Sequence, residues 1–408
     1  MWYSDYNCFK KRGVCRNKAD VCNMKVGLFG YGVVGSGIYE FLLRDEMRHN
    51  ITVGSVLERR DIPEIKEIRS ENVDEILADD TIDTVIEVLG GFEPAHTFAL
   101  KAVKAGKNLI TANKLMLAEN YSEIMRAARE KGVSVAFSAT VGGGIPFLKN
   151  LALVSHADTV LEVGGIMNGT TNFILDEMQS KGADFAETLK KAQELGYAEA
   201  NPSADIDAID LRCKLALCCS VGFDAACYPG DIPTMGVRHI QKKDIEVFRA
   251  HGLRVRLIGK GVRLPDGSVS AFCEPTLVGP GQNEYSVYGV ENYIYYIGER
   301  TGKHGFGGYG AGRKTTAVNV YLDAIDILHG YSPFDQVSCE NNLKVDASGA
   351  KHRYYLRTTA DLPKEIEVEV RLGNGMYITK PMGVLEMHNL AHTMQETDET
   401  TFFAGWTE

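Results

Sequence analysis

Two hydrophobic periods alternate along the first third of the chain. Short apolar runs have the length of buried strands and stand at 25–29, 51–57, 84–89, 108–111 and 133–138. Between several of them apolar residues recur every three or four positions, which predicts amphipathic helices at 33–45, 95–106 and 121–132. Strands that alternate with crossover helices predict an α/β fold with a parallel, doubly wound sheet of the Rossmann type.

The pattern changes after GGGIP (142–146), which we take as the domain boundary. Beyond it the elements are mixed, with helices near 170–180, 185–195 and 208–221 and strands near 254–262 and 268–278. The glycine-rich GFGGYGAG (305–312) then precedes an amphipathic helix at 314–330. We expect a dinucleotide-binding domain at 24–145, completed by the helix at 310–330, a second α+β substrate-binding and dimerisation domain at 146–309, and a short C-terminal extension at 350–408. Residues 1–23 are polar and basic, and we expect them to be a disordered or mis-assigned N-terminal tail.

Composition narrows the classes of partner. Of the 408 residues, 44% are hydrophobic and 24% charged, as in ordinary soluble globular proteins. The net charge of −10 disfavours a nucleic-acid partner, because such binding needs a basic face. No apolar run reaches the ~20 residues of a membrane-spanning helix, so no membrane association is predicted. The nine cysteines form no CxxC pair, which disfavours zinc and disulfides and favours a cytoplasmic location.

The segment FGYGVVG carries the spacing G-x-G-x-x-G directly after a strand and at the start of a helix. Gly30 permits a tight turn, Gly32 lets a pyrophosphate approach the backbone, and Gly35 allows close packing of helix on strand. A nicotinamide dinucleotide is therefore the predicted cofactor. The second strand ends in Glu58-Arg59-Arg60, where an acid would select NAD and an arginine NADP. We favour NADP and keep NAD as the alternative.

A second candidate region follows the next strands. VLGG (88–91) and TANK (111–114) each come after a strand and so fall at the carboxyl edge of the sheet, where ligands of open α/β sheets bind. Lys114 at this edge could hold a substrate carboxylate or act near the nicotinamide. A plain surface lysine is the alternative interpretation.

The third candidate region is GYAEANPSADIDAIDLRCKLALCC (196–219). Asp210 and Lys214 are four residues apart on a predicted helix and so share one face. The apolar residues after Lys214 predict burial, which lowers the pKa of a lysine, while nearby carboxylates raise it; such opposed influences suit proton transfer. The carboxylates that precede the helix could bind a substrate ammonium group. The combination favours a dehydrogenase acting on an amino acid over a solvated ion pair.

Together these motifs resemble the homoserine dehydrogenase family over about residues 24–330. The resemblance runs through VGLFGYGVVGSG, IEVLGG, ITANK, VGGGIP, GIMNGTTNFIL and the segment just described to GYGAG. It implies reversible NAD(P)-dependent interconversion of L-homoserine and L-aspartate 4-semialdehyde in the biosynthesis of threonine, methionine and isoleucine. It further implies a catalytic set of Lys214, Lys114 and Asp210, substrate binding by Glu199 and Asp205, and cofactor contacts at Gly30, Tyr31, Gly32, Val33, Val34, Gly35, Arg59, Arg60, Lys114 and Gly312. Asp207 matches no role.

The resemblance also implies a homodimer or higher homo-oligomer, and a monovalent cation (Na or K) held by the backbone carbonyls of Val141, Gly143 and Ile145. The chain departs from the family at this loop, because Ser138 stands where family members usually carry glutamate. YYLR (354–357) resembles the first strand of a regulatory ACT domain, but the turn expected after it is absent. We therefore expect a truncated or atypical ACT-like segment at 350–408 and predict no inhibition by threonine. Two alternatives remain: a phosphorylating semialdehyde dehydrogenase, which would need a cysteine nucleophile, and a non-catalytic NAD(P)-binding regulatory protein.

Overall fold

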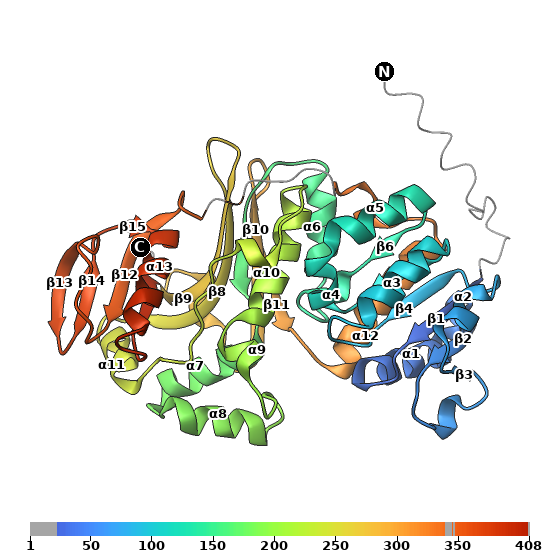
Figure 1. Ribbon diagram of the computed structural model, residues 1–408, viewed down its shortest axis with the longest axis horizontal. Helices are drawn as coiled ribbons and strands as arrows, with labels where there is room; N and C mark the ends of the chain where they lie inside the picture. The colour runs from blue at the N-terminus through green and yellow to red at the C-terminus, as the bar shows by residue number, and fades with distance from the viewer. Residues whose placement is uncertain (1–22, 339–344, 346, 407–408) are drawn as a thin grey trace. The chain divides into compact units, whose positions relative to one another are not determined.

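The computed structural model describes residues 23–338, 345 and 347–406, which divide into two compact units (Figure 1). The first unit contains the chain up to residue 149 and the segment from 311 to 338, and the second contains 150–310 and the C-terminal part. The predicted domain limits differ from this division by a few residues. The segment 350–408, predicted as an extension, is grouped with the second unit, and the predicted tail at 1–23 lies almost wholly outside the described residues.

The sheet of the first unit has six strands, all parallel, in the order β3-β2-β1-β4-β5-β6. The strands are β1 (Met24–Phe29), β2 (Ile51–Leu57), β3 (Arg69–Ser70), β4 (Thr84–Glu87), β5 (Asn108–Thr111) and β6 (Val135–Ala136). This order is that of the Rossmann fold and confirms the predicted fold class. Phe29 and Glu87, which end β1 and β4, are in register, so the loops after these two strands leave the sheet side by side.

The helices of the first unit are α1 (Val33–His49), α2 (Val73–Ala78), α3 (Ala95–Lys104), α4 (Lys114–Glu119), α5 (Tyr121–Lys131) and α12 (Arg313–Leu328). Helix α1 packs against α12, although 264 residues separate their ends in the chain order, and α3 packs against α5 (Figure 1). The strand predicted at 133–138 is too long, because the chain turns into a short 3-10 helix at Ser138–Thr140.

The second unit contains a mixed ten-stranded sheet. Its strands are β7 (Val160–Ile166), β8 (Arg254–Arg263), β9 (Val269–Val278), β10 (Glu291–Gly298), β11 (Gly302–Tyr309), β12 (Lys351–Arg357), β13 (Val368–Gly373), β14 (Met376–Thr379), β15 (Met382–Gly383) and β16 (Phe402–Trp406). Strand β16 pairs in parallel with β9, which joins the C-terminal segment to the sheet. The sequence analysis predicted neither α13 (Val384–Gln395) nor β16 in this segment.

The remaining helices are α6 (Phe147–Ser155), α7 (Gly169–Lys181), α8 (Phe185–Glu194), α9 (Ser203–Ile206), α10 (Ile209–Gly222) and α11 (Lys242–Ala250). Helix α10 packs on strands β7, β8 and β9, which is why the residues after Lys214 are buried. None of the helices in the described part of the chain combines the length and the apolarity that a membrane span requires.

Candidate active site

The turn between β1 and α1 has the form of a pyrophosphate cradle. Gly30 has a φ of 100°, a value that disfavours any side chain, and a Cβ on Gly35 would lie 2.1 Å from the carbonyl oxygen of Gly30. A Cβ on Gly32, by contrast, would meet nothing within 4 Å. The outer glycines are therefore required by the fold, and the middle one faces open space. A ligand phosphate there would meet the N-terminus of the 17-residue helix α1, with its positive dipole end.

The residues after β2 are arranged around one carboxylate. Glu58 accepts hydrogen bonds from the Nε (3.1 Å) and Nη2 (2.7 Å) atoms of Arg60 and from the backbone N–H of Arg59 at 2.9 Å. The side-chain hydrogen bond from Arg60 is the main reason that the pKa of Glu58 falls to about 2. Arg60 also donates to the carbonyl of Tyr31, within the glycine turn, at 2.9 Å. Arg59 is exposed, and its side chain has no hydrogen-bond or ion-pair partner among the described residues.

A buried acid that the sequence analysis missed organises the neighbouring loops. Glu87 ends β4, is 0% exposed, and accepts hydrogen bonds from Thr111 Oγ1 at 2.6 Å and from the N–H of Leu89 at 2.8 Å. Burial raises the pKa of its carboxyl group. Asn113 donates to the carbonyl of Gly91 at 2.8 Å. The acid inside the apolar run TVIEVL was the signal that could have identified Glu87.

Asn113 also caps helix α4. Its Oδ1 accepts the N–H of Met116 at 3.2 Å, which satisfies one donor of the first turn. Lys114 is the first residue of α4 and is partly buried. The structure therefore places Lys114 at the carboxyl edge of the parallel sheet, on a backbone held by the network around Glu87.

In the second unit, Lys214 and Asp210 form a buried ion pair. Nζ of Lys214 lies 2.7 Å from Oδ2 of Asp210 and donates to the carbonyl of Met167 at 2.6 Å. Lys214 is 8% exposed. Nδ2 of Asn168 donates to Oδ2 of Asp210 at 2.9 Å and to Oδ1 of Asp205 at 2.7 Å. One amide thus bridges the two aspartates, and four side chains form one hydrogen-bonded network.

Local backbone geometry explains how these residues meet. Asn168 is the N-cap of α7, where its Oδ1 accepts the N–H of Thr171 at 2.9 Å. Ala208, between α9 and α10, has a left-handed backbone with a φ of 60°, which a non-glycine residue adopts at a cost of about 1–2 kcal/mol. This turn separates α9, which carries Asp205, from α10, which carries Asp210.

Two acids of the same segment lie outside the network. Glu199 is exposed, and its carboxylate makes no hydrogen bond or ion pair with any other described residue. Asp207 pairs with Arg238 through two bonds of 2.8 and 2.6 Å. Asp207 therefore has a structural partner of its own, consistent with the absence of a family role for it.

Comparisons with known proteins agree with this picture. Residues 30–138 match the family model described as "Homoserine dehydrogenase, NAD binding domain", and residues 146–325 match the model "Homoserine dehydrogenase". The homoserine dehydrogenase of Synechocystis sp. is 37% identical over 321 residues, which cover 75% of this chain and 73% of that protein. The chain belongs to the homoserine dehydrogenase family. The homoserine dehydrogenase of Bacillus subtilis is 34% identical over 317 residues, with 75% and 73% covered.

Solved structures of homoserine dehydrogenases are similar along nearly the whole chain. That from Thiobacillus denitrificans has a TM-score of 0.83 and 28% identity, and covers 95% of this chain and 98% of its own. That from S. aureus at pH 7.5 has a TM-score of 0.73 and 26% identity, and covers 94% and 99%. The resemblance found in the motifs is confirmed. The protein is an NAD(P)-dependent oxidoreductase of homoserine that serves amino-acid biosynthesis.

Gly312 and the loop expected to hold a cation lie at helix α12. Gly312 precedes α12 and has a φ of 133°, which favours glycine. The carbonyls of Gly143 and Ile145 both accept hydrogen bonds from Nδ2 of Asn319, at 2.6 and 3.2 Å. Val141, the third expected ligand, is fully buried. Two of the three carbonyls expected to bind the cation therefore already accept a hydrogen bond from Asn319.

The described cysteines do not supply the nucleophile that a phosphorylating semialdehyde dehydrogenase needs. Cys213, Cys218, Cys219, Cys227 and Cys273 are all buried and form no disulfide. Burial raises the pKa of the thiols of Cys218, Cys219 and Cys273 well above the usual value, so these sulfurs stay protonated and unreactive.

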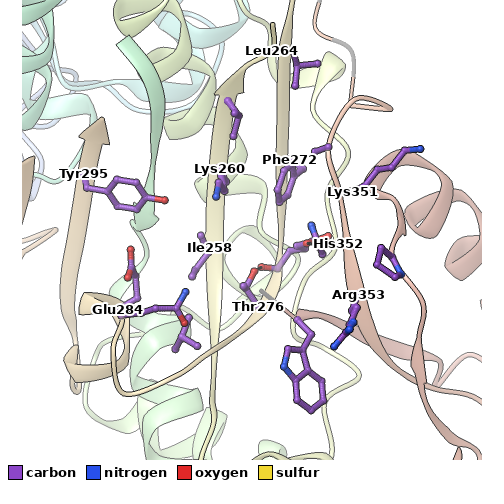
Figure 2. A pocket seen from close by; sticks show the side chains of 17 residues that line it. Ile258, Lys260, Leu264, Phe272, Thr276, Glu284, Tyr295, Lys351, His352 and Arg353 are labelled. Carbon is purple, nitrogen blue, oxygen red and sulfur yellow. Dashed lines mark hydrogen bonds and ion pairs between the residues drawn. The ribbon is translucent and has the colours of Figure 1, made fainter. Parts of the chain in front are cut away.

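A cavity of about 520 Å³ lies elsewhere in the second unit, beside strands β8, β9 and β12 (Figure 2). Its lining includes Lys260, Glu274 and His352, together with Tyr295 on β10, which β7 separates from the strand of Lys260 (Figure 2). Lys260 pairs with Glu162 at 3.1 Å, and His352 with Glu274 at 2.7 Å. The cavity contains none of the predicted catalytic or substrate-binding residues, so it is separate from the network around Lys214.

Proposed function

We propose that Lys214 is the acid–base group in the interconversion of L-homoserine and L-aspartate 4-semialdehyde. The observation that carries the proposal is the way its ammonium group is held. An ammonium has three N–H donors, and two of them are directed at Asp210 and at the carbonyl of Met167. The third remains for a substrate oxygen. Burial keeps water from competing for it.

The chemistry requires a proton and a hydride to move on neighbouring atoms of the substrate. The nicotinamide cofactor, when bound, exchanges the hydride with the substrate carbon. In the reducing direction Lys214 gives a proton to the oxygen that becomes the hydroxyl of homoserine, and in the oxidising direction its neutral amine takes that proton. Asp210 orients the side chain through the 2.7 Å ion pair. General acid–base help of this kind contributes about 10²–10⁴ in rate.

Substrate recognition is assigned to the acids near α10 and to Lys114. Glu199 is exposed and has no described partner, so its carboxylate is available to the substrate ammonium group. Asp205 is hydrogen-bonded to Asn168 and adds a second negative charge for the substrate ammonium group. Lys114, at the carboxyl edge of the Rossmann sheet, acts as the second active-site lysine.

We infer that NADP is the preferred cofactor. The acid that would bind a ribose 2′-hydroxyl, Glu58, already accepts hydrogen bonds from Arg60, while the guanidinium of Arg59 is exposed and has no described partner. Arg59 is therefore the group suited to a 2′-phosphate, with the pyrophosphate beside Gly32.

The oligomeric state and the cellular compartment belong to the same proposal. We propose a homodimer formed through the second unit, supported by β11, an edge strand that pairs only with β10 among the described strands and exposes Tyr309. Light scattering coupled to gel filtration would test it. The cytoplasm is the proposed compartment, because the five described cysteines are free thiols.

The test of the proposed function is steady-state oxidation of L-homoserine with NADP and with NAD in parallel, monitored by the reduced nicotinamide. We expect turnover with both cofactors and a higher kcat/KM with NADP. The reverse assay, with L-aspartate 4-semialdehyde and NADPH, should run without inorganic phosphate. Oxidation of L-aspartate 4-semialdehyde that needs both NADP and inorganic phosphate would instead support the phosphorylating alternative, and cofactor binding without turnover would support the regulatory one.

A further inference from the structure

The glycine-rich turn that follows the 3-10 helix presents two carbonyl groups to helix α12. Gly142 and Gly143 have φ values of 74° and 54°, and the turn is closed by a bond of 2.8 Å from the N–H of Ile145 to the carbonyl of Gly142. Asn319, on α12, is 2% exposed. Its Nδ2 donates to the carbonyls of Gly143 at 2.6 Å and Ile145 at 3.2 Å. The turn is thus tied to α12 by one buried amide.

This amide takes the position that a cation would need. An asparagine side chain has two N–H donors, which matches one donor for each of the two carbonyls. A cation bound to the same oxygens would have to lie where Nδ2 lies, so the donor set does not fit a bound cation. The N–H groups of the amide also place partial positive charge against the two carbonyl oxygens, as a bound cation would.

A second side chain of α12 holds the start of the loop. Asp323 accepts hydrogen bonds from the backbone N–H of Ser138 at 2.9 Å and from its Oγ at 2.6 Å. Asn319 and Asp323 are four residues apart and therefore share one face of the helix. The loop from Ser138 to Ile145 is consequently fastened at both ends by side chains of the protein itself.

We propose that the side-chain amide of Asn319 replaces the monovalent cation expected at this loop. The stability of the enzyme and its oxidation of homoserine then need neither Na⁺ nor K⁺. Removal of the amide leaves the two buried carbonyls without a donor, and a cation becomes their next available partner.

The experiment compares thermal unfolding of the full-length wild type and of Asn319→Ala in choline chloride, NaCl and KCl at equal ionic strength. This readout is independent of the assigned activity, and homoserine oxidation is measured in the same three salts. Val318→Ala, at a partly exposed position of the same helix, is the matched control. Choline is too large to enter the turn and serves as the inert cation.

We expect the wild type and Val318→Ala to have the same Tm and the same activity in all three salts. Asn319→Ala should lose on the order of 5 °C in choline chloride and regain part of it in NaCl or KCl. A saturable rise of wild-type Tm or activity with Na⁺ or K⁺ would overturn the proposal, and this result does not require the variant to fold. An Asn319→Ala protein that folds but ignores both cations would overturn it too.

Discussion

Asn168 performs two tasks that substitutions can separate. Its Oδ1 caps α7 through the N–H of Thr171, and its Nδ2 bridges Asp205 and Asp210. Asn168→Ser keeps a capping hydroxyl and loses the bridge, whereas Asn168→Ala loses both. Hydrogen bonds to charged groups contribute about 1.5–3 kcal/mol each. If the loss of one such bond lets Asp210 turn away from Lys214, kcat should fall roughly 10- to 100-fold in both variants.

The cap affects stability and not catalysis. Loss of an N-cap costs about 1 kcal/mol, so the Tm of Asn168→Ala should lie roughly 2–4 °C below that of Asn168→Ser. The assay is kcat and KM for L-homoserine at saturating NADP, with Tm from calorimetry. Asp207→Asn is the control, because Asp207 pairs with Arg238 instead, and its kcat should equal that of the wild type. Wild-type kcat in a folded Asn168→Ser protein would refute the bridging role.

Three further predictions concern the first unit. Gly32→Ala should fold normally but bind NADP at least tenfold more weakly in a fluorescence titration. Gly35→Ala should unfold at a clearly lower temperature, because the new Cβ would lie 2.1 Å from a backbone oxygen. Equal behaviour of the two variants would contradict the pyrophosphate cradle. Arg59→Ala should raise KM for NADP by about tenfold or more and leave KM for NAD nearly unchanged, and a parallel rise in both would argue against a phosphate contact. Burial raises the pKa of Asp323 to about 7. Between about pH 4 and pH 7 the folded protein therefore keeps a proton that the unfolded chain releases. The free energy of unfolding falls as the pH rises through this window, by at most about 4 kcal/mol. Asp323→Asn should flatten the urea midpoints between pH 5 and pH 8, and an unchanged slope would show that other groups cause it.

The middle of the parallel sheet was predictable because β1, β4 and β5 are almost wholly buried and so appear as apolar runs. The glycine spacing was equally informative, since Gly30 and Gly35 meet steric requirements of the fold and Gly32 faces open space where a ligand can approach. The helical spacing of Asp210 and Lys214 likewise predicted their ion pair. These features depend on residues that are near one another in the chain or on a repeated local pattern.

Features that depend on distant residues were missed. The bridge from Asn168 reaches Asp210, 42 residues further along the chain, and no local pattern predicts it. Asn319 looked like one polar residue on an amphipathic helix, and its partners are 174 and 176 residues away. Strand β11 is rich in glycine and shows no alternation of side chains, so its pairing with β10 was not predictable from pattern.

The most direct test of the account is the turnover of Lys214→Ala. Asp210 keeps its bond from Asn168 in this variant, which limits the penalty of leaving its charge unpaired. We predict that kcat for homoserine oxidation falls by about 10²–10⁴ while the Kd for NADP stays within twofold of wild type, and that added methylamine restores part of the rate. A folded Lys214→Ala enzyme with wild-type kcat would contradict the assignment of Lys214 as the acid–base group.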